Sequence, residues 1–504
     1  MRGAWRTRRI TMQFSIVLTV VCFAFSGSAH NILVFLPNKI WSHYFQVEPI
    51  FHALANRGHN LTIVSPFPPK KKNPNIRHFP LELIRFDEIL PNKNLMEHSF
   101  EQWHAIFSIS MWKKMADARI PKLLESSVFQ DLYNGDNKFD LIFTELFFAQ
   151  EALVVLGHIF NAPVVTYSSY GYDTEILRYS GAMNAVAYLS WKDSSYPTVH
   201  PLSLFERLDN ALINFAAMLF NEYWYFPDHD ALLAKHLPGP LPRITDMLRN
   251  VSLFFLTANT AVDGAKLFPP NVIELSGIHM EEPEPLDKDL EIMMNEAKDG
   301  VIFFSYGSQP YSPNSSNFNI PHNVHIRSWF DQRSVLAHPK CVLFMTHGGV
   351  SSTMEAIHYA VPVIGTPFYG DQINNMANAE YLGYGLRLDY LNTTHESLTW
   401  AINTVLGDSR FKENIGKASK VFTDKPMSSL DTAIYWIEYV IRHDGAHHLK
   451  PVTVHMPWYQ LFFLDVFVIC AAIIFMMVYL FVKLVLFLCR KRVIGTKPLK
   501  SKNQ

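Results

Sequence analysis

Cysteine is scarce in this chain of 504 residues, which contains only four. Three of them, Cys22, Cys470 and Cys489, lie in or beside apolar segments near the two ends of the chain. Cys341 is the only cysteine in the long stretch between those segments. An intramolecular disulfide is therefore excluded there, and with it the class of small secreted domains that disulfides stabilise.

A surplus of charge of one sign is also absent, since 44 Lys and Arg residues face 45 Asp and Glu residues and the net charge is -1. Proteins that bind nucleic acids neutralise the phosphates with a surplus of Lys and Arg. We therefore expect no nucleic-acid partner. The length exceeds what one hydrophobic core usually serves, so we expect two domains with appended segments.

The first apolar segment has the order of a signal peptide. Four arginines between Arg2 and Arg9 precede an apolar core from Phe14 to Phe25, and Gly27, Ser28 and Ala29 follow. This pattern predicts a cleaved secretory signal peptide over residues 1–29.

The second apolar segment is long enough to cross a bilayer. Val466 to Val482 is uninterrupted, and with its apolar flanks it predicts a transmembrane helix over residues 461–488. A buried core helix is the alternative. A cytosolic tail over residues 489–504, which is basic and has no acidic residue, agrees better with a single-pass protein whose body lies on the luminal side.

The tail also suggests a compartment. Lys500 and Lys502 lie five and three residues from the end, as in a dilysine signal that returns proteins to the endoplasmic reticulum. A basic tail that only sets the topology is the alternative. We expect an endoplasmic reticulum membrane protein.

Two short apolar runs, Cys341–Met345 and Val361–Gly365, predict buried strands of a parallel sheet. The first run leads into a glycine turn, and Ser352 with Glu355 has the spacing of a capping box at the start of a helix. Backbone N–H groups at such a helix N-terminus form a site for an anion such as a diphosphate. After the second run, Asp371 and Gln372 should reach the same edge of the sheet, where open α/β folds bind ligands.

Taken singly, these residues have plainer uses, because Ser352 and Glu355 can cap a helix and His347 can bind a loop carbonyl. Together they resemble the signature of the UDP-glycosyltransferases, position by position: Thr346, His347, Gly349, Ser352, Glu355, Pro362, Pro367, Asp371 and Gln372. The resemblance covers nearly all of the mature chain. It implies an α/β protein of the GT-B class with two facing Rossmann-like domains: an acceptor-binding domain over residues 30–275 and a UDP-sugar-binding domain over 276–450.

The resemblance also implies roles for the residues of the donor site. Trp329 would stack on the uracil ring, and Gln332 would bind the uridine by a hydrogen bond. The diphosphate would be held by His347, by the backbone at Gly349 and by Ser352, with Ser308 facing the phosphates from the preceding strand. Glu355 would accept from the ribose hydroxyls, and Asp371 and Gln372 would bind the donor sugar.

The N-terminal half predicts a catalytic base. A strand at Asn31–Leu36 and a helix at Phe45–Arg57 enclose His43, which should lie at the carboxyl edge of the sheet near a helix N-terminus. A second strand, Phe139–Thr144, brings Glu145 to the same edge. Taken alone, His43 could be an ordinary loop histidine, and Glu145 could be a carboxylate that the helix dipole favours at a helix start. The resemblance implies that His43 is the base and Glu145 its acidic partner, where many members have aspartate.

One segment departs from the family pattern. Only residues 309–328 separate Ser308 from Trp329, and they are rich in Ser, Asn and Pro without a helical period. A crossover between parallel strands commonly takes about 30 residues or more. We expect that one β-α unit is missing, and that the loss of an interior strand forces its neighbours to pair again or leaves a gap.

The expected reaction is transfer of a sugar, with inversion, from a UDP-sugar to a hydroxyl of a small lipophilic acceptor. The chain most resembles arthropod members, so glucose is expected ahead of glucuronic acid. Neither a cofactor nor a metal is expected, because the donors between His347 and Ser352 can hold the leaving diphosphate. The alternatives are an inactive membrane protein that binds a homologue in a homo- or hetero-oligomer, and a non-functional shortened isoform.

Overall fold

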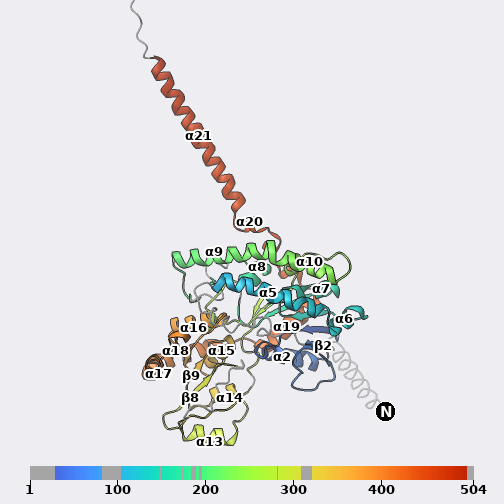
Figure 1. Cartoon of the computed structure of the whole chain (residues 1–504), viewed down its shortest axis with the longest axis vertical. Helices are drawn as coiled ribbons and strands as arrows, with labels where there is room; N and C mark the ends of the chain where they lie inside the picture. Colours follow the sequence, from blue (N-terminus) through green and yellow to red (C-terminus); the bar gives the residue numbers. More distant parts are fainter. Residues whose placement is uncertain are drawn as a thin grey trace, which may run out of the picture. The chain divides into compact units, whose positions relative to one another are not determined.

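The computed structural model describes residues 29–81, 104–147, 149–172, 174–182, 189–191, 196–280, 282–307 and 321–495 (Figure 1). Residues 1–28 of the predicted signal peptide, Ser308 and residues 496–504 of the predicted tail lie outside these ranges. The chain divides into two units, Met1–Pro451 and Val452–Gln504, which are described separately.

Within the described ranges, the first sheet has seven parallel strands in the order β3-β2-β1-β4-β5-β6-β7. The strands are β1 (Asn31–Phe35), β2 (Asn60–Ser65), β3 (Ile76–Pro80), β4 (Leu141–Thr144), β5 (Val164–Ser168), β6 (Leu253–Leu256) and β7 (Val272–Glu274). The central strands are apolar and buried, as expected of a parallel sheet covered on both faces. The strand order reverses between β1 and β4, and ligands of open α/β sheets bind at such a switch point.

Helices cover the two faces of this sheet. One face packs on a cluster that includes Met115 and Ile120, and the other on a cluster that includes Val47 and Phe51. The helices of this half are α2 (Trp41–Asn56), α5 (His104–Leu124), α6 (Ser127–Asn134), η1 (Glu151–Val154), α7 (Val155–Ile159), α8 (Thr174–Ser180), α9 (Leu204–Phe220), η3 (Asn221–Tyr225), α10 (Phe226–His236), α11 (Ile244–Arg249) and α12 (Thr260–Asp263).

In the part of the chain that the structure describes, the second sheet has four parallel strands in the order β11-β10-β9-β8. They are β8 (Val301–Ser305), β9 (Cys341–Thr346), β10 (Val363–Gly365) and β11 (Gly385–Arg387). The helices of this half are α13 (Lys288–Glu296), α14 (Gln332–Ala337), α15 (Val350–His358), α16 (Asp371–Tyr381), η5 (Tyr390–Asn392), α17 (His395–Gly407) and α18 (Ser409–Thr423). Two parallel sheets with helices around them are the arrangement that the sequence predicted.

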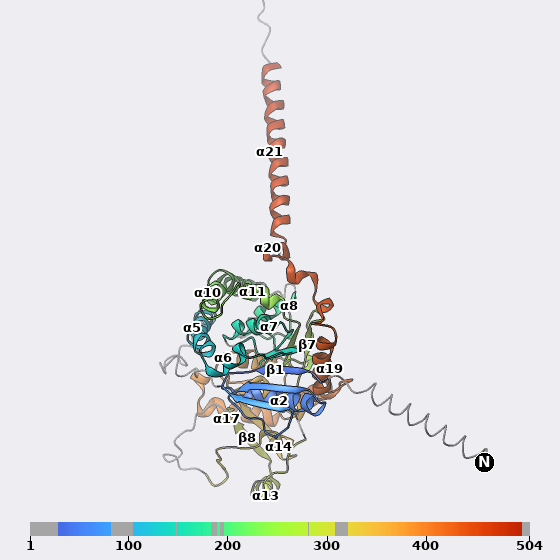
Figure 2. The same cartoon turned by 90° about the vertical axis from the view of Figure 1, so that its right-hand side faces the viewer.

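After the second sheet, the chain returns to the first. The helix α19 (Ser429–Arg442) buries Ala433, Ile434 and Ile437 in the cluster that also holds α2, and Figure 2 shows α19 beside β7. Arg57 at the end of α2 binds Glu438 of α19 through Nε and Nη2, at 2.6 and 2.9 Å. The short helices η6 (His447–Leu449) and η7 (Val452–His455) follow.

The position of β8 shows where the shortened segment leaves the second sheet. Within the described residues, β8 is the edge strand of its sheet and pairs directly with β9, with one irregularity between Val301 and Ile302. The predicted loss of one β-α unit stays a prediction, because residues 308–320 of the segment lie outside the described ranges. Order along the chain does not fix order in a parallel sheet, because a crossover can pass over neighbouring positions. The consequence is an edge strand on which Ile302 and Phe304 are exposed.

The second unit contains α20 (Trp458–Leu461) and a helix of 32 residues, α21 (Leu464–Gly495). Within α21, Leu464–Arg490 has a mean hydropathy of 2.7 and is long and apolar enough to cross a membrane. The segment lies within three residues of the predicted span at each end. Its side chains are exposed, which contradicts the alternative of a buried core helix.

Candidate active site

His43 lies in the first turn of α2. The helix begins at Trp41, earlier than the predicted Phe45, so His43 belongs to the helix and does not precede it. Ile40 occupies the N-cap position, and its side chain makes no capping hydrogen bond. His43 therefore lies at the N-terminal end of the helix dipole.

Glu145 follows β4 and contacts His43 across the switch point of the first sheet. The His43 Nδ1 atom lies 3.0 Å from Glu145 Oε1 and 3.1 Å from Oε2. The Glu145 carboxylate is buried and also accepts a hydrogen bond of 2.7 Å from Ser169 Oγ. A carboxylate that accepts from Nδ1 fixes the tautomer in which Nε2 carries the lone pair and can take up a proton.

Sequence reasoning missed the groups that hold this pair in place. Ser169 directly follows β5, the neighbour of β4, so its position at the same edge was readable once the strand order was known. Gln46 anchors α2, because its Nε2 donates to the carbonyls of Ser42 and Ser169 at 2.8 and 3.2 Å. Tyr167 and Thr257 both donate to the Gln46 carbonyl oxygen. These bonds fasten the first turns of α2 to the ends of β5 and β6.

The predicted uridine residues lie at the start of α14. The Trp329 side chain is 65% exposed, which leaves its ring available for stacking. The neighbouring Phe330 packs edge-to-face on Phe303 of β8 and holds this segment against the sheet. Gln332 is the first residue of α14, and its Nε2 donates to Ser352 Oγ at 3.1 Å and to Glu355 Oε2 at 2.8 Å.

Ser352 and Glu355 do not form the predicted capping box. The helix α15 begins at Val350 with Gly349 as its N-cap, so Ser352 lies inside the first turn and both side chains are buried. The spacing of a capping box is the same as the spacing of two neighbours on one helix face, and the sequence did not separate them. Here the shared face brings both side chains to Gln332.

His279 is a further residue that sequence reasoning missed. It follows β7, is buried, and its Nε2 lies 3.1 Å from Glu355 Oε1. Phe45 of α2 packs edge-on against the His279 ring with a centroid distance of 5.0 Å. Arg333 Nη1 donates to the His279 carbonyl at 2.7 Å. Both oxygens of Glu355 therefore have a protein partner, and each retains a second lone pair for a ligand hydroxyl.

His347 is enclosed by glycines. A Cβ atom at Gly349 would lie 2.6 Å from His347 Nε2, and one at Gly307 would lie 2.9 Å from Cε1. Burial lowers the pKa of His347 to about 4. The ring is therefore neutral near pH 7 and approaches an anion as a hydrogen-bond donor, with no charge of its own.

Asp371 and Gln372 shape the turns around the site. Asp371 Oδ2 accepts from the Val350 backbone N–H at 3.1 Å and from Asn375 Nδ2 at 2.7 Å, so it lies against the N-terminus of α15. Burial raises the pKa of Asp371 to about 6. The Gln372 side-chain oxygen accepts from the backbone N–H groups of Phe368 and Tyr369 at 2.9 and 3.4 Å.

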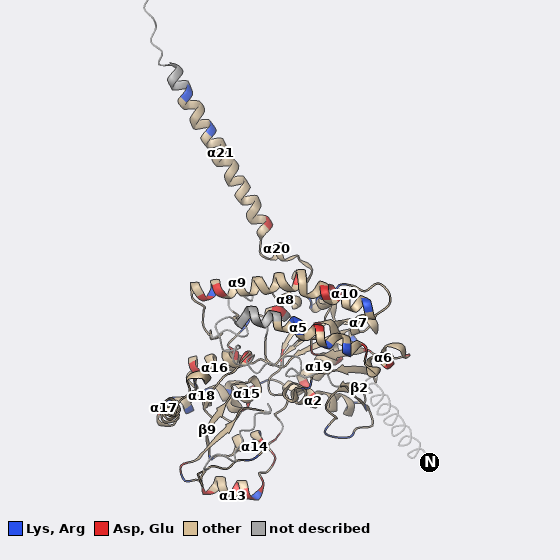
Figure 3. Ribbon diagram, in the orientation of Figure 1, with Lys and Arg blue, Asp and Glu red and all other residues tan. Residues whose placement is uncertain are grey.

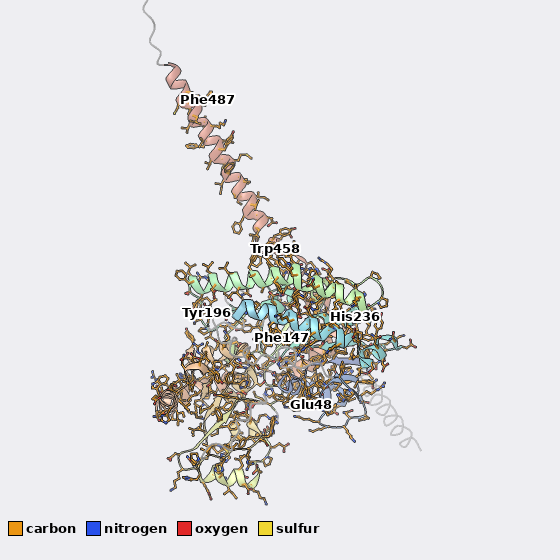
Figure 4. The ribbon with its side chains drawn as sticks, in the orientation of Figure 1. Glu48, Phe147, Tyr196, His236, Trp458 and Phe487 are labelled. Atoms are coloured by element: carbon orange, nitrogen blue, oxygen red, sulfur yellow. The ribbon has the colours of Figure 1, made fainter. Side chains whose placement is uncertain are left out.

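A small pocket lies where the two halves meet. Its lining is Tyr170, Gly171, Tyr172, Ser190, Asp263, Asp371, Asn374 and Asn375. Hydrogen bonds also join α16 to the N-terminal half of the chain. Asn374 Nδ2 donates to the carbonyl of Tyr196, which is labelled in Figure 4, at 2.6 Å, and the Thr198 backbone N–H donates to Asn378 Oδ1 at 2.7 Å. The predicted sugar-binding residue Asp371 thus shares the pocket lining with residues of the N-terminal half.

Asp263 should make the stability of the protein depend on pH. Burial raises its pKa from 3.8 to about 7. The proton stabilises the folded state fully below pH 3.8, and this stabilisation is lost as the pH rises to about 7. Asp263→Asn removes the ionisation. We expect the difference in free energy of unfolding, variant minus original chain, to rise by roughly 2–4 kcal/mol between pH 4 and pH 7.

Chemical unfolding of both proteins at a series of pH values measures this difference. Asp246→Asn, at an exposed aspartate of α11, is the matched control and should give a nearly constant difference. An Asp263→Asn curve parallel to that of the original chain would contradict the buried ionisation.

The structure thus brings His43 and Glu145 together at the first sheet, and Gln332, Ser352 and Glu355 together beside α15. His347, Gly349, Asp371 and Gln372 lie around the N-termini of α15 and α16. Ser308 lies outside the described residues. Among the described residues, no group of three or more His, Cys, Asp or Glu side chains is placed to hold a metal ion.

Comparison with known proteins identifies the family. The family model described as UDP-glucoronosyl and UDP-glucosyl transferase matches residues 31–315 and 313–498. UDP-glucosyltransferase 2 of Dactylopius coccus is 32% identical over 494 residues, which cover 90% of this chain and 93% of that protein. UDP-glucuronosyltransferase 2B14 of Oryctolagus cuniculus is 26% identical over 543 residues, covering 96% and 97%. The chain belongs to the UDP-glycosyltransferase family.

A solved structure agrees in fold. CalG4, the calicheamicin glycosyltransferase, superposes with a TM-score of 0.53 at 16% identity and covers 83% of this chain and 100% of its own. The two parallel sheets are therefore those of a GT-B glycosyltransferase. The protein is a hexosyltransferase that uses a UDP-sugar.

Proposed function

We propose that this protein transfers glucose from UDP-glucose to a hydroxyl of a small lipophilic acceptor, with inversion at the anomeric carbon. His43 Nε2 takes the proton of the acceptor hydroxyl, and Glu145 stabilises the resulting imidazolium. The acceptor oxygen forms a bond to the anomeric carbon as the bond between that carbon and UDP breaks. The electron pair of the broken bond leaves with the diphosphate of UDP. The contact of 3.0 Å between His43 and Glu145 at the switch point carries this proposal.

The donor roles follow the arrangement around α15. The exposed Trp329 ring stacks on uracil, and Gln332 binds the uridine. Glu355 accepts from the ribose, since each of its oxygens has one lone pair beyond those used by His279 and Gln332. Neutral His347, the Gly349 backbone and Ser352 donate to the diphosphate. Asp371 and Gln372 face the sugar.

The lining of the pocket favours a neutral sugar. Glucuronic acid carries a carboxylate, and a site that selects it needs a cation to offset the cost of removing that charge from water. The described lining contains no Lys or Arg and includes two aspartates, Asp263 and Asp371. At neutral pH the ionised Asp371 repels a second carboxylate, whereas the oxygens of both aspartates accept from the hydroxyls of glucose. The name of one Dactylopius relative, UDP-glucosyltransferase 2, points the same way.

We expect kcat/KM for UDP-glucose to exceed that for UDP-glucuronate by at least about tenfold, a difference of about 1.4 kcal/mol. Microsomes containing the full chain, a panel of phenols and steroids, and both radiolabelled donors measure it. Asp263→Asn should reduce the discrimination without abolishing transfer. Equal use of both donors would contradict the glucose assignment alone, whereas UDP binding without turnover of either donor would contradict the proposed function itself.

The acceptor site is aromatic. Phe147, two residues after Glu145, stacks on Tyr170 with a centroid distance of 3.7 Å, and Trp112 of α5 packs on Phe147 at 5.7 Å. Tyr170 and Tyr172 also line the pocket. An apolar surface beside the base suits a flat or lipophilic alcohol. Small phenols and related alcohols are therefore the acceptors that we propose.

We also propose that the enzyme is a single-pass protein of the endoplasmic reticulum membrane with a luminal body. Asn250 and Asn392 are exposed and stand in glycosylation sequons. In cells they are expected to carry glycans, so endoglycosidase H should lower the apparent mass. Asn250→Gln with Asn392→Gln should reduce that shift, and sequons also stand at Asn60 and Asn314. An unshifted product that leaves the membrane in carbonate would contradict this topology.

A further inference from the structure

The helix α9 exposes its apolar side and buries polar residues. Five large apolar side chains on it are exposed, and Phe205 reaches 80%: Leu204, Phe205, Leu208, Leu212 and Phe215. They recur at the three- and four-residue spacing that puts side chains on one face of a helix. A helix on the surface of a water-soluble domain normally turns such a face inward. Here the face, which we name the α9 stripe, points outward.

The buried side of α9 fixes this orientation. Asn210 and Asn214 are buried there. The Trp191 backbone N–H donates to Asn210 Oδ1 at 2.7 Å, and Asn210 Nδ2 donates to the Leu189 carbonyl at 2.8 Å. Asn214 Nδ2 donates to the Asn210 carbonyl at 2.7 Å. Rotating the helix to bury the leucines would break the bonds of Asn210 to Trp191 and Leu189 inside the protein, so the outward orientation of the stripe is fixed by the fold.

The stripe continues into η3. This π-helical turn presents Tyr223 and Trp224 to the outside while Tyr225 and Phe226 are buried. From Leu204 to Trp224 the exposed apolar residues extend over about 30 Å. The sequence contains no charged residue from Asn210 to Asn221. In Figure 3 the charged residues of α9 gather near its beginning and most of the helix is uncharged.

We infer that the α9 stripe inserts into the lipid surface of the membrane that holds the candidate span. The first unit ends at Pro451 and the span begins at Leu464, so twelve residues, 452–463, connect them. Twelve residues reach at most about 40 Å when fully extended. With the span inserted, the first unit is therefore always close to lipid, and an apolar stripe gains more by entering the interface than by remaining in water.

The composition of the stripe also defines the kind of lipid contact. Arg207 is the only basic residue between Leu204 and Trp224, so attraction to anionic headgroups contributes little. Binding rests on apolar burial, with Tyr223 and Trp224 as residues that favour the interface. The contact should therefore form equally well with uncharged lipids. A second copy of the chain is the other occupant that would cover such a face.

Depth-dependent fluorescence quenching on the full chain in phosphatidylcholine nanodiscs tests the contact. Single cysteines replace Leu212 or Phe215 in a chain whose Cys470 and Cys489 are serine, and each carries an NBD label. Val421→Cys on α18, an exposed apolar position of similar exposure outside the stripe, is the matched control. Labelled Cys470 in the span is the control for insertion. Transfer of glucose by each labelled protein shows that it is folded.

Doxyl-labelled lipid is expected to reduce NBD emission at residues 212 and 215 at least about twofold and to leave residue 421 nearly unchanged. The inference is overturned if doxyl lipid quenches the label at residue 212 no more than the label at residue 421, while the label at Cys470 is quenched. A second result would also overturn the inference, in favour of contact with a second copy of the chain. In that result the NBD emission at residue 212 is blue-shifted but is not quenched by doxyl lipid. The blue shift is then lost when the nanodiscs are diluted to one chain each. Loss of quenching at Cys470 as well would contradict the span on which the inference rests.

Discussion

His43→Ala is expected to lower the turnover number by about 10²- to 10⁴-fold, the range for loss of a general base. The acceptor hydroxyl then has no group to take its proton as it attacks. Glu145→Gln should cause a smaller loss, because the amide oxygen still accepts from Nδ1 but carries no charge to stabilise the imidazolium. Steady-state transfer from UDP-glucose, with the acceptor at saturation, measures both.

His52→Ala is the matched control for His43→Ala. His52 lies on the same helix and is partly buried, and its Nε2 is 3.7 Å from Glu48, away from Glu145. Its loss should change the turnover number less than about twofold. UDP affinity should be unchanged in His43→Ala, since the base does not contact the uridine. A His43→Ala enzyme with more than half of the original turnover would remove His43 from the proposed chemistry.

Glu355→Ala is expected to weaken UDP binding by about 10- to 100-fold. Hydrogen bonds to a charged group are worth about 1.5–3 kcal/mol, and each 1.4 kcal/mol is tenfold in affinity. The substitution removes the acceptor for the ribose hydroxyls and also leaves His279 and Gln332 without their shared partner. Titration calorimetry with UDP measures the loss independently of turnover.

His279→Ala separates the two parts of this effect. It leaves the Glu355 carboxylate in place but removes the contact of 3.1 Å that holds Oε1. We expect a loss of UDP affinity smaller than that of Glu355→Ala, with the turnover number at saturating UDP-glucose nearly unchanged. His279→Gln should restore part of the affinity because it can still donate to the carboxylate. If Glu355→Ala binds UDP as tightly as the original chain, the carboxylate does not reach the ribose.

Contacts between strand ends could be predicted from the sequence. His43 and Glu145 each follow an apolar run, and the carboxyl ends of parallel strands share an edge. The structure places β1 beside β4 and thereby brings the two side chains together. The strand at Cys341–Thr346 and the turn after it follow from the same reasoning, because apolar runs and glycines define them locally.

Other features depend on tertiary packing, which leaves no local pattern. His279 and Glu355 are 76 residues apart, and no spacing rule connects them. Asp371 lies against the N-terminus of α15 although it begins a different helix. The edge position of β8 is a further such feature, because the order of strands in a parallel sheet depends on how the crossovers pack.

The shortened connection leaves the paired residues of the site in place. It departs from the edge strand β8, so its length does not disturb the pairing of β8 with β9 or the turn that holds His347. The alignment with the Dactylopius protein has 494 positions, which is more than 90% of this 504-residue chain can fill. The Dactylopius protein therefore has residues that this chain lacks. The two segments of the family match meet at residues 313–315, inside the connection.

The anomeric configuration of the product tests the central claim most directly. The full chain in microsomes receives UDP-glucose, in which the sugar is the α-anomer, together with a phenol, and proton NMR reads the configuration of the glucoside formed. Direct attack by an acceptor that His43 deprotonates predicts the β-glucoside, formed by the original chain and not by His43→Ala. An α-glucoside, or a β-glucoside formed equally by both proteins, would contradict it.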